Sequence, residues 1–134
     1  MSEGSLNGKV ISEIGVSMAV ERLLRAGFQV AVPIVDDGYD LLAFSGRRFW
    51  RIQVKATAIS TCKRNRSRIR IGRGKRRTGR YTAADVDAFV VVNIATNVVM
   101  CVPIADAIGK SHLNWSSAHK YGDLCLLRSI PPLK

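Results

Sequence analysis

Two short apolar runs separated by a polar turn form the clearest pattern in the sequence. Residues 41–44 and residues 49–56 flank the Gly-containing turn 45–48, and this arrangement predicts a β-hairpin. Because side chains alternate across a strand, Gln53 and Lys55 share one face of the second strand. The opposite face carries the apolar side chains of Ile52, Val54 and Ala56. Core packing explains the apolar face, whereas the polar pair calls for another explanation.

A helix is predicted before the hairpin, over residues 9–25. Asn7 or Ser5 can cap a helix that begins near Gly8, and Gly27 is a suitable stop. Its apolar residues are spread widely around the helix, so we expect it to be buried over much of its surface.

The rest of the chain predicts a mixed sheet with helices packed on it. Residues 28–35 read as a strand in which Pro33 indicates an edge position, and a turn at 36–38 leads into the hairpin. The β-branched run 89–94 is typical of a central strand buried on both faces. Further predicted elements are strands at 67–72, 98–102 and 124–127, the last at an edge, and short helices at 81–87 and 103–108.

The positive charge of the chain is concentrated in one segment. The formal net charge is +11, and no Asp or Glu occurs from residue 41 to residue 84. We call residues 63–80 the basic segment, and we expect it to form a loop or arm inserted in the domain at about residues 60–80. A polyanion must neutralise such charge density, and the phosphate backbone of nucleic acid is suited to do so. The DNA-binding candidates are its ten basic residues, Lys63, Arg64, Arg66, Arg68, Arg70, Arg73, Lys75, Arg76, Arg77 and Arg80.

Length and composition predict a single domain over residues 1–134 with an ordinary core. No apolar stretch is long enough to span a membrane, and the N-terminus lacks the pattern of a signal peptide. We therefore expect a cytoplasmic, nucleoid-associated protein without a membrane partner. The three cysteines lack CxxC spacing, which favours reduced thiols over disulfides or a zinc site.

Four polar groups need a common explanation: Glu13, Asp40, Gln53 and Lys55. Closing the hairpin brings Asp40, at the start of one strand, across from Gln53 and Lys55 near the end of the other. Oxygen ligands of this kind hold Mg²⁺ or Mn²⁺ against a phosphate, and a neighbouring lysine can orient or activate the attacking water. Glu13 shares a helix side with apolar residues, so it either reaches this site or lies at the edge of the stripe in contact with water.

The order of these elements resembles the PD-(D/E)XK nuclease superfamily from Gly8 to about Pro103. In this resemblance Asp40 is the first motif acid, preceded by Tyr39 rather than Pro, and Gln53-Val54-Lys55 is the second motif. Gln at that position is similar to a minority of restriction enzymes and to small intron-encoded homing endonucleases, and Holliday-junction resolvases share the helix–hairpin plan. The resemblance implies an α/β fold of the restriction-endonuclease type, with a mixed β-sheet flanked by α-helices.

The same resemblance implies a Mg²⁺- or Mn²⁺-dependent endonuclease that hydrolyses DNA, duplex or branched. Its metal ligands would be Asp40, the Gln53 side-chain oxygen and Glu13, with the Val54 carbonyl as a further ligand, and Lys55 would be the catalytic lysine. Cutting both strands of a duplex is simplest with two active sites, so a homodimer or homotetramer is expected.

Two alternatives stay open at this point. An amide attracts Mg²⁺ less than a carboxylate does, so Gln53 also suits a catalytically weak or inactive DNA-binding protein of the same fold. The basic segment is equally natural in an RNA-binding protein. His112 and His119 read as surface residues, because nothing near them in the sequence indicates a metal site.

Overall fold

The computed structural model describes residues 7–34, 38–59, 68–70, 85–108, 110, 112–115 and 118–131. The helices among them are α1 (Gly8–Arg25), α2 (Ile104–Ala107), α3 (Ala118–Tyr121) and the 3₁₀ helix η3 (Leu124–Ser129). The strands are β1 (Gln29–Ala31), β2 (Leu41–Ser45), β3 (Arg48–Thr57), β4 (Arg68–Arg70), β5 (Ala88–Asn93), β6 (Val98–Pro103) and β7 (His112–Asn114).

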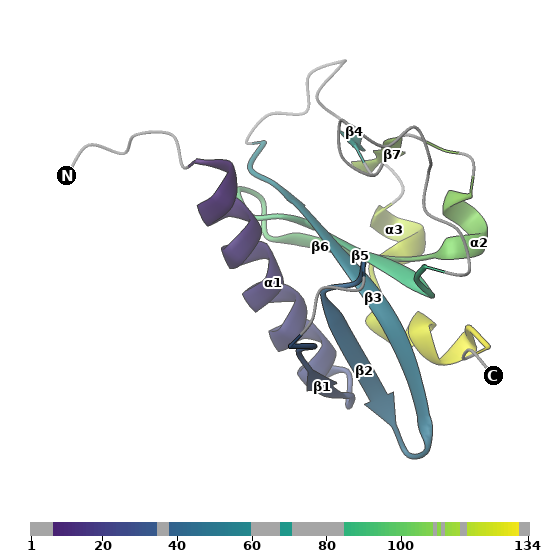
Figure 1. The fold of residues 1–134 in the computed structure, drawn as a ribbon. Coiled ribbons are helices and arrows are strands. Elements are labelled where there is room, and N and C mark those ends of the chain that lie inside the picture. Colours follow the sequence, from purple (N-terminus) through teal and green to yellow (C-terminus); the bar gives the residue numbers. More distant parts are fainter. Residues whose placement is uncertain are drawn as a thin grey trace.

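Five strands form one mixed sheet in the order β1-β2-β3-β5-β6. Three neighbouring pairs are antiparallel, and β3 and β5 at the centre are parallel. Figure 1 shows the long β3 crossing the middle of the molecule, with α1 on one side and the small β4–β7 ribbon and α2 on the other. The predicted mixed sheet with flanking helices is therefore confirmed.

The first helix follows its sequence signals closely. The Asn7 side chain caps it by accepting a hydrogen bond from the N–H of Val10, and Gly27 leaves it with a φ of 91°. Burial is narrower than expected, because only a line of small and aliphatic residues, Gly15, Ala19 and Leu23, is fully covered. The prediction of a widely buried helix was wrong: Leu24 is 54% exposed and Val10 is 38% exposed.

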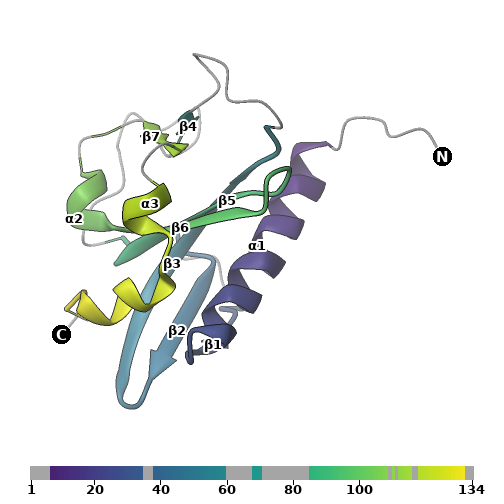
Figure 2. The same cartoon turned by 180° about the vertical axis from the view of Figure 1, so that it is seen from behind.

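Hydrophobic side chains pack on both faces of the sheet. The first core cluster joins α1 and η3 to the face of β3 that carries Trp50, Ile52 and Val54. The second cluster joins β4, β7 and α2 to the opposite face, through Phe89 and Val91 of β5. In the view from behind, α1 is on the right and the C-terminal segment on the left, and both pack on the face of the sheet that carries Trp50 (Figure 2). The strand β5 is buried on both faces along its whole length, as predicted for a central strand.

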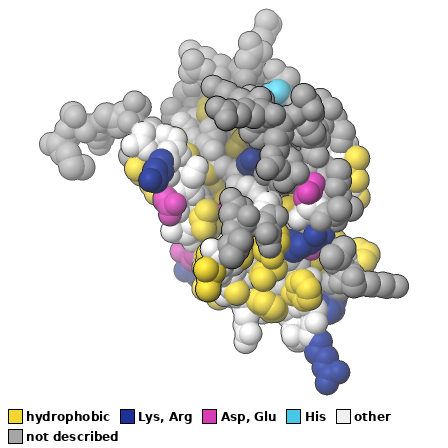
Figure 3. Space-filling model, in the orientation of Figure 1, with side chains coloured by type: hydrophobic (Ala, Val, Ile, Leu, Met, Phe, Trp, Pro, Cys, Tyr) yellow, Lys and Arg dark blue, Asp and Glu magenta, His cyan; other side chains and the backbone are white. Residues whose placement is uncertain are grey.

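The predicted hairpin is confirmed in its residues and in its register. Its strands β2 and β3 are antiparallel, with Ser45 opposite Arg48 and Leu41 opposite Ile52. Part of the hairpin is uncovered, and Phe49, which lies on the face opposite to Trp50, is 39% exposed. Figure 3 shows hydrophobic side chains gathered over the lower part of the molecule, where Figure 1 places β2 and β3.

Several predicted elements end elsewhere or differ in type. The predicted edge strand at 124–127 is wrong, because Leu124 begins the 3₁₀ helix η3, which Asp123 caps through the N–H of Cys125. The predicted helix at 81–87 does not include residues 85–87, which form a turn and a bend, and residues 81–84 lie outside the described residues. The strand β1 has three residues and lies at the sheet edge, as Pro33 indicated.

None of the helices in the described ranges combines the length and the apolar character needed to cross a bilayer. Of the two cysteines among these residues, Cys101 is buried, Cys125 is exposed, and both are free thiols.

Candidate active site

Asp40 lies where the two strands of the hairpin part. The five-residue β2 pairs with β3 as far as Ile52, whereas the ten-residue β3 continues to Thr57. The backbone N–H of Asp40 donates to the Ile52 carbonyl at 2.8 Å, and the N–H of Val54 donates to Oδ2 of the Asp40 carboxylate at 2.9 Å. Beyond Ile52, β2 no longer pairs with β3, and the Asp40 carboxylate accepts the hydrogen bond of the Val54 N–H there. This bond holds the carboxylate beside residues 53–55.

The side chain of Gln53 lies on the face of β3 opposite to Ile52 and Val54. The paired register of β2 and β3 ends at Leu41 and Ile52, and the hydrogen bonds of Asp40 to Ile52 and Val54 hold it beside β3 at this point. Lys55 follows two residues later on the same face, while the alternate residues Ile52 and Val54 are buried in the first core cluster. Asp40, Gln53 and Lys55 are each half-buried, so water and a ligand can reach them.

Glu13 lies on α1, which packs on the face of β3 that carries Ile52 and Val54, opposite to Gln53 and Lys55. Two residues further along α1, Gly15 packs so closely against Ala56 that an added Cβ would collide with it. This contact places the first half of α1 beside Val54 and Ala56, near the C-terminal end of β3. The Glu13 side chain is on the exposed side of the helix, where it lines a shallow groove with Ile14, Ser17, Met18 and Glu21.

A family model described as PD-(D/E)XK endonuclease matches residues 6–119 of the chain. This match covers well over half of the sequence, including the hairpin and α1. The chain belongs to the PD-(D/E)XK endonuclease family. Asp40, Gln53 and Lys55 are the residues whose order along the chain suggested that resemblance.

The fold of this PD-(D/E)XK endonuclease is also similar to that of a solved structure. That structure is a bacterial homing endonuclease with 20% sequence identity and a TM-score of 0.68. The similarity covers 81% of this chain and 78% of the homing endonuclease chain, so it extends over nearly the whole fold. A comparison with curated protein sequences finds no match.

A buried ion pair joins β3 to the residue before β5 close to the candidate site, and the sequence analysis did not predict it. The guanidinium of Arg51 and the carboxylate of Asp87 are both buried, with Nε 3.2 Å from Oδ2. The same oxygen accepts the backbone N–H of Arg51 at 2.7 Å. Asp87 directly precedes the buried strand β5, and an acid in that position is the signal that would have pointed to it. The pair ties β3 to β5 two residues before Gln53.

The basic segment lies mostly outside the described residues. Its described part is the strand β4, whose backbone pairs with β7 in the register Arg68–Asn114 and Arg70–His112. The predicted strand at 67–72 is thus confirmed over three residues. The segment is attached to the second core cluster through Ile69, on the sheet face that carries Gln53 and Lys55.

The donor set of the PD-(D/E)XK site fits a hard divalent cation of low protein coordination. Mg²⁺ commonly binds one or two carboxylates, keeps several waters and shares the phosphate oxygens of its substrate. Asp40 offers a carboxylate held by the N–H of Val54, and Gln53, the preceding residue on β3, offers an amide oxygen. Within the described ranges, no group of three or more His, Cys, Asp or Glu side chains converges to form a cage for a metal. An open site completed by substrate suits this set better than a closed structural site.

Proposed function

We propose that the protein is a divalent-metal-dependent endonuclease that hydrolyses phosphodiester bonds of DNA. The observation that carries the proposal is the 2.9 Å hydrogen bond from the Val54 N–H to Asp40, because Val54 separates Gln53 from Lys55. It supports a single site built from a carboxylate, an amide and an ammonium group. Membership of the PD-(D/E)XK endonuclease family supports the reaction class.

Each residue of the site has a distinct proposed role. Asp40 would hold the metal through its carboxylate, and Gln53, the residue before Val54 on β3, would add a neutral oxygen. The bound metal would lower the pKa of a coordinated water and neutralise charge on the phosphate. Lys55, on the same strand face as Gln53, would orient the attacking water and stabilise the negative charge that develops on the phosphorus oxygens.

Glu13 would supply the charge that Gln53 lacks. Asp40 alone brings one negative charge, and a second carboxylate raises the affinity of an oxygen site for a divalent cation. The exposed position of Glu13 near the start of α1 suits contact with a metal-bound water. Glu21 lines the same groove two turns away, so Glu13→Gln and Glu21→Gln form a matched pair. We expect Glu13→Gln to raise the metal concentration needed for cleavage and Glu21→Gln to leave it unchanged.

The basic segment would bind the phosphate backbone around the cut. Ten Lys and Arg residues in this segment account for nearly the whole net charge of the chain. Lys and Arg at phosphates release counterions, so binding should weaken steeply as salt rises. Two active sites would be needed to cut both strands, which favours a homodimer or homotetramer. The similarity to a homing endonuclease structure favours a homing-type enzyme over a restriction enzyme or a junction resolvase.

A nicking assay on supercoiled plasmid tests the proposal. We expect cleavage with Mg²⁺ or Mn²⁺, none with EDTA, and a loss of at least a hundredfold in rate for Asp40→Asn and Lys55→Ala. Lys9→Ala is the matched control for Lys55→Ala, because Lys9 is exposed at the start of α1. Cleavage that survives Lys55→Ala at the rate of the control would contradict the proposed role of Lys55.

A binding protein without catalysis is the second candidate, and Gln53 is the observation that favours it. A neutral ligand in place of a carboxylate weakens the metal site, while the basic segment would still hold DNA. Absence of cleavage under every metal tried, together with tight binding of duplex DNA, would favour this candidate. Stronger binding of structured RNA than of duplex DNA in competition would contradict both.

A further inference from the structure

The sheet face that carries Gln53 and Lys55 leaves the end of the β2–β3 hairpin at the surface. The second core cluster covers this face over β5 and β6, and none of its described members lies on β1, β2 or β3. Phe49 is exposed here, and its ring lies 6.2 Å from the ring of the half-buried Phe44. Exposed apolar side chains grouped on one face can mark an interaction surface.

Two neighbouring arginines at the hairpin end have different surroundings. Arg48 points to the opposite face of the sheet, where its guanidinium lies 4.7 Å from the centre of the Trp50 ring and donates to the Arg128 carbonyl at 2.8 Å. Arg47 is exposed in the turn before β3 and makes no hydrogen bond, ion pair or ring contact with any residue that the structure describes. The Arg47 charge is therefore available to a partner, whereas Arg48 attaches the hairpin to the C-terminal segment.

Contacts on the back of the hairpin hold its end in one position. The Trp50 indole N–H donates to the Ile130 carbonyl at 2.8 Å, and the Trp50 ring meets the Phe28 ring edge-on with 5.6 Å between the ring centres. Together with the Arg48 contacts, these interactions join the hairpin to η3 and to the residues that follow α1. A surface that is ordered before binding loses less conformational entropy when it binds a partner.

The charge of the hairpin selects an anionic partner. Residues 41–84 contain no Asp or Glu, so no carboxylate of the hairpin can pair with Arg47. A symmetric contact between two copies of the chain through this face would bring two positively charged surfaces together, and like charges at a contact oppose binding. The phosphate backbone of DNA complements the surface instead.

The hairpin end is aligned with the candidate active site along one strand. Phe49 and Gln53 lie on the same face of the continuous strand β3, and four residues of strand span about 13 Å. This distance equals the rise of about four base pairs of DNA. Arg47 lies beyond Phe49, in the turn that projects at the lower end of the molecule in Figure 1. A duplex that runs along β3 would therefore meet the candidate active site and the hairpin end together.

We propose that the end of the β2–β3 hairpin is a second DNA-contact surface, in which Arg47 binds a backbone phosphate and Phe49 packs against a neighbouring sugar. The inference rests on the proposed DNA endonuclease function and extends it by fixing the duplex about four base pairs from the cut. Such a contact adds affinity and sets the orientation of the duplex without reading base sequence.

Binding of a labelled duplex in EDTA, measured by fluorescence anisotropy at several salt concentrations, tests this surface without cleavage. Loss of one phosphate contact should lower the slope of log K against log salt by about 1, equally for different DNA sequences. We expect this change for Arg47→Ala and no change for Lys9→Ala. Phe49→Ala should weaken binding at every salt concentration and leave the slope unchanged.

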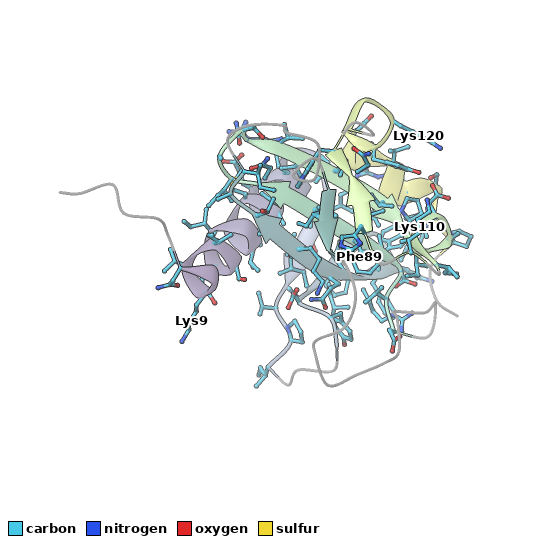
Figure 4. The ribbon with its side chains drawn as sticks, turned by 90° about the horizontal axis from the view of Figure 1, so that it is seen from above. Lys9, Phe89, Lys110 and Lys120 are labelled. Carbon is cyan, nitrogen blue, oxygen red and sulfur yellow. The ribbon has the colours of Figure 1, made fainter. Side chains whose placement is uncertain are left out.

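Lys9 is a matched control because it carries the same charge at a distance from the hairpin. Figure 4 shows Lys9 at the outer end of α1, pointing away from the sheet, and Figure 1 places that end of α1 opposite the hairpin turn. Equal reductions of the slope for Arg47→Ala and Lys9→Ala overturn the hairpin contact, because they show a general effect of charge. Circular dichroism confirms that each variant is folded.

The outcomes separate this inference from the proposed function. An unchanged salt slope for Arg47→Ala in an enzyme that still cleaves plasmid overturns the hairpin contact and leaves the endonuclease standing. A reduced slope in a protein that fails to cleave supports the hairpin contact and counts against catalysis.

Analytical ultracentrifugation without DNA distinguishes DNA from a second copy of the chain as the partner of this face. We expect the same mass for the wild type and for Phe49→Ala, because Phe49 would contact DNA rather than protein. A smaller assembly for Phe49→Ala, together with an unchanged salt slope for Arg47→Ala, would show that the face joins two copies and would overturn the proposal.

Discussion

The carboxylate of Asp87 accepts hydrogen bonds from both the side chain and the backbone N–H of Arg51. The Arg51 N–H lies 2.7 Å from Oδ2, and the terminal guanidinium nitrogen lies 3.3 Å from Oδ1. The backbone N–H of Asp87 in turn donates to the Arg51 carbonyl at 2.9 Å. These contacts fix the parallel register of β3 and β5, and with it the position of Gln53 two residues further along β3.

Removing one member of this pair should strongly destabilise the protein. Asp87→Ala leaves the Arg51 charge buried without its partner, and the loss of a partner in a buried ion pair costs about 3–5 kcal/mol of unfolding free energy. Urea denaturation followed by circular dichroism measures the change.

An exposed ion pair provides the control for the Asp87 variant. Glu21 lies 3.2 Å from Arg25 on the surface of α1, and such pairs contribute about 0–1 kcal/mol. Glu21→Ala should therefore change the unfolding free energy by less than about 1 kcal/mol. Equal effects of the two variants would show that the Arg51–Asp87 pair adds no more than a surface contact.

Restoring a carboxylate at position 53 should tighten the metal site. Gln53→Glu adds a second negative charge next to Val54, whose N–H binds Asp40. This charge raises affinity for a divalent cation but makes the two carboxylates repel each other in its absence. We expect half-maximal cleavage at a lower Mg²⁺ concentration and a lower melting temperature in EDTA. Gln29→Glu on the exposed edge strand β1 makes the same change away from the site and should alter neither quantity.

The contact between α1 and β3 should be intolerant of a single methyl group. A Cβ at position 15 would collide with the Cβ of Ala56, whereas a Cβ at position 8 meets nothing within 4 Å. Gly15→Ala should cost about 1–3 kcal/mol through overpacking, and Gly8→Ala should be neutral or slightly stabilising. Thermal unfolding of the two variants measures the difference, and equal melting temperatures would show that α1 shifts freely over the sheet.

The thiol of Cys101 should remain unreactive in the folded protein. Burial, with a smaller contribution from the charge of Asp123, raises the pKa of Cys101 from 9.0 to about 12. A thiol reagent at pH 8 should modify the exposed Cys125 within minutes and reach Cys101 only through unfolding. A Cys62→Ser background isolates these two thiols, and mass spectrometry identifies the modified one.

The same pKa shift predicts a loss of stability at high pH. The unfolded chain ionises Cys101 above about pH 9, whereas the folded protein keeps it neutral up to about pH 12. Stability from this group is therefore present below pH 9 and falls as the pH rises toward 12. The difference in urea midpoint between the wild type and Cys101→Ala should shrink over this range, and a constant difference would contradict the shift.

Local sequence signals were sufficient for the elements that position the site. The cap at Asn7 and the stop at Gly27 bounded α1, and the alternation around Gln53 identified both faces of β3. The pairing of Asp40 with the Gln53–Lys55 region followed from the length of the hairpin turn, and the hydrogen bond to Val54 agrees with it. In each case the determining residues lie close together in the sequence.

Features set by distant contacts were not predictable in the same way. The Arg51–Asp87 pair joins residues that are neighbours only because β3 and β5 are parallel. Residues 124–127 form a short apolar run that was predicted as a strand, but they form a 3₁₀ helix in which Leu124 and Leu127, three residues apart, pack in the first core cluster. Trp115 is buried in the second cluster, far along the chain from most of the residues it joins there. The narrow burial of α1 likewise depends on the width of the sheet beneath it rather than on its own pattern.

Inserting the basic segment between two adjacent parallel strands has a consequence for how this scaffold can change. The sheet fixes both ends of the connection, at Thr57 and Ala88. Doubling the length of a flexible connection costs only about 0.6 kcal/mol of closure entropy. Mutation can therefore lengthen or shorten this connection, outside Ile69 and residues 85–87, while the hairpin, the Arg51–Asp87 pair and the Asp40 contact stay in place. Target preference and catalytic geometry can evolve along separate routes in such a molecule.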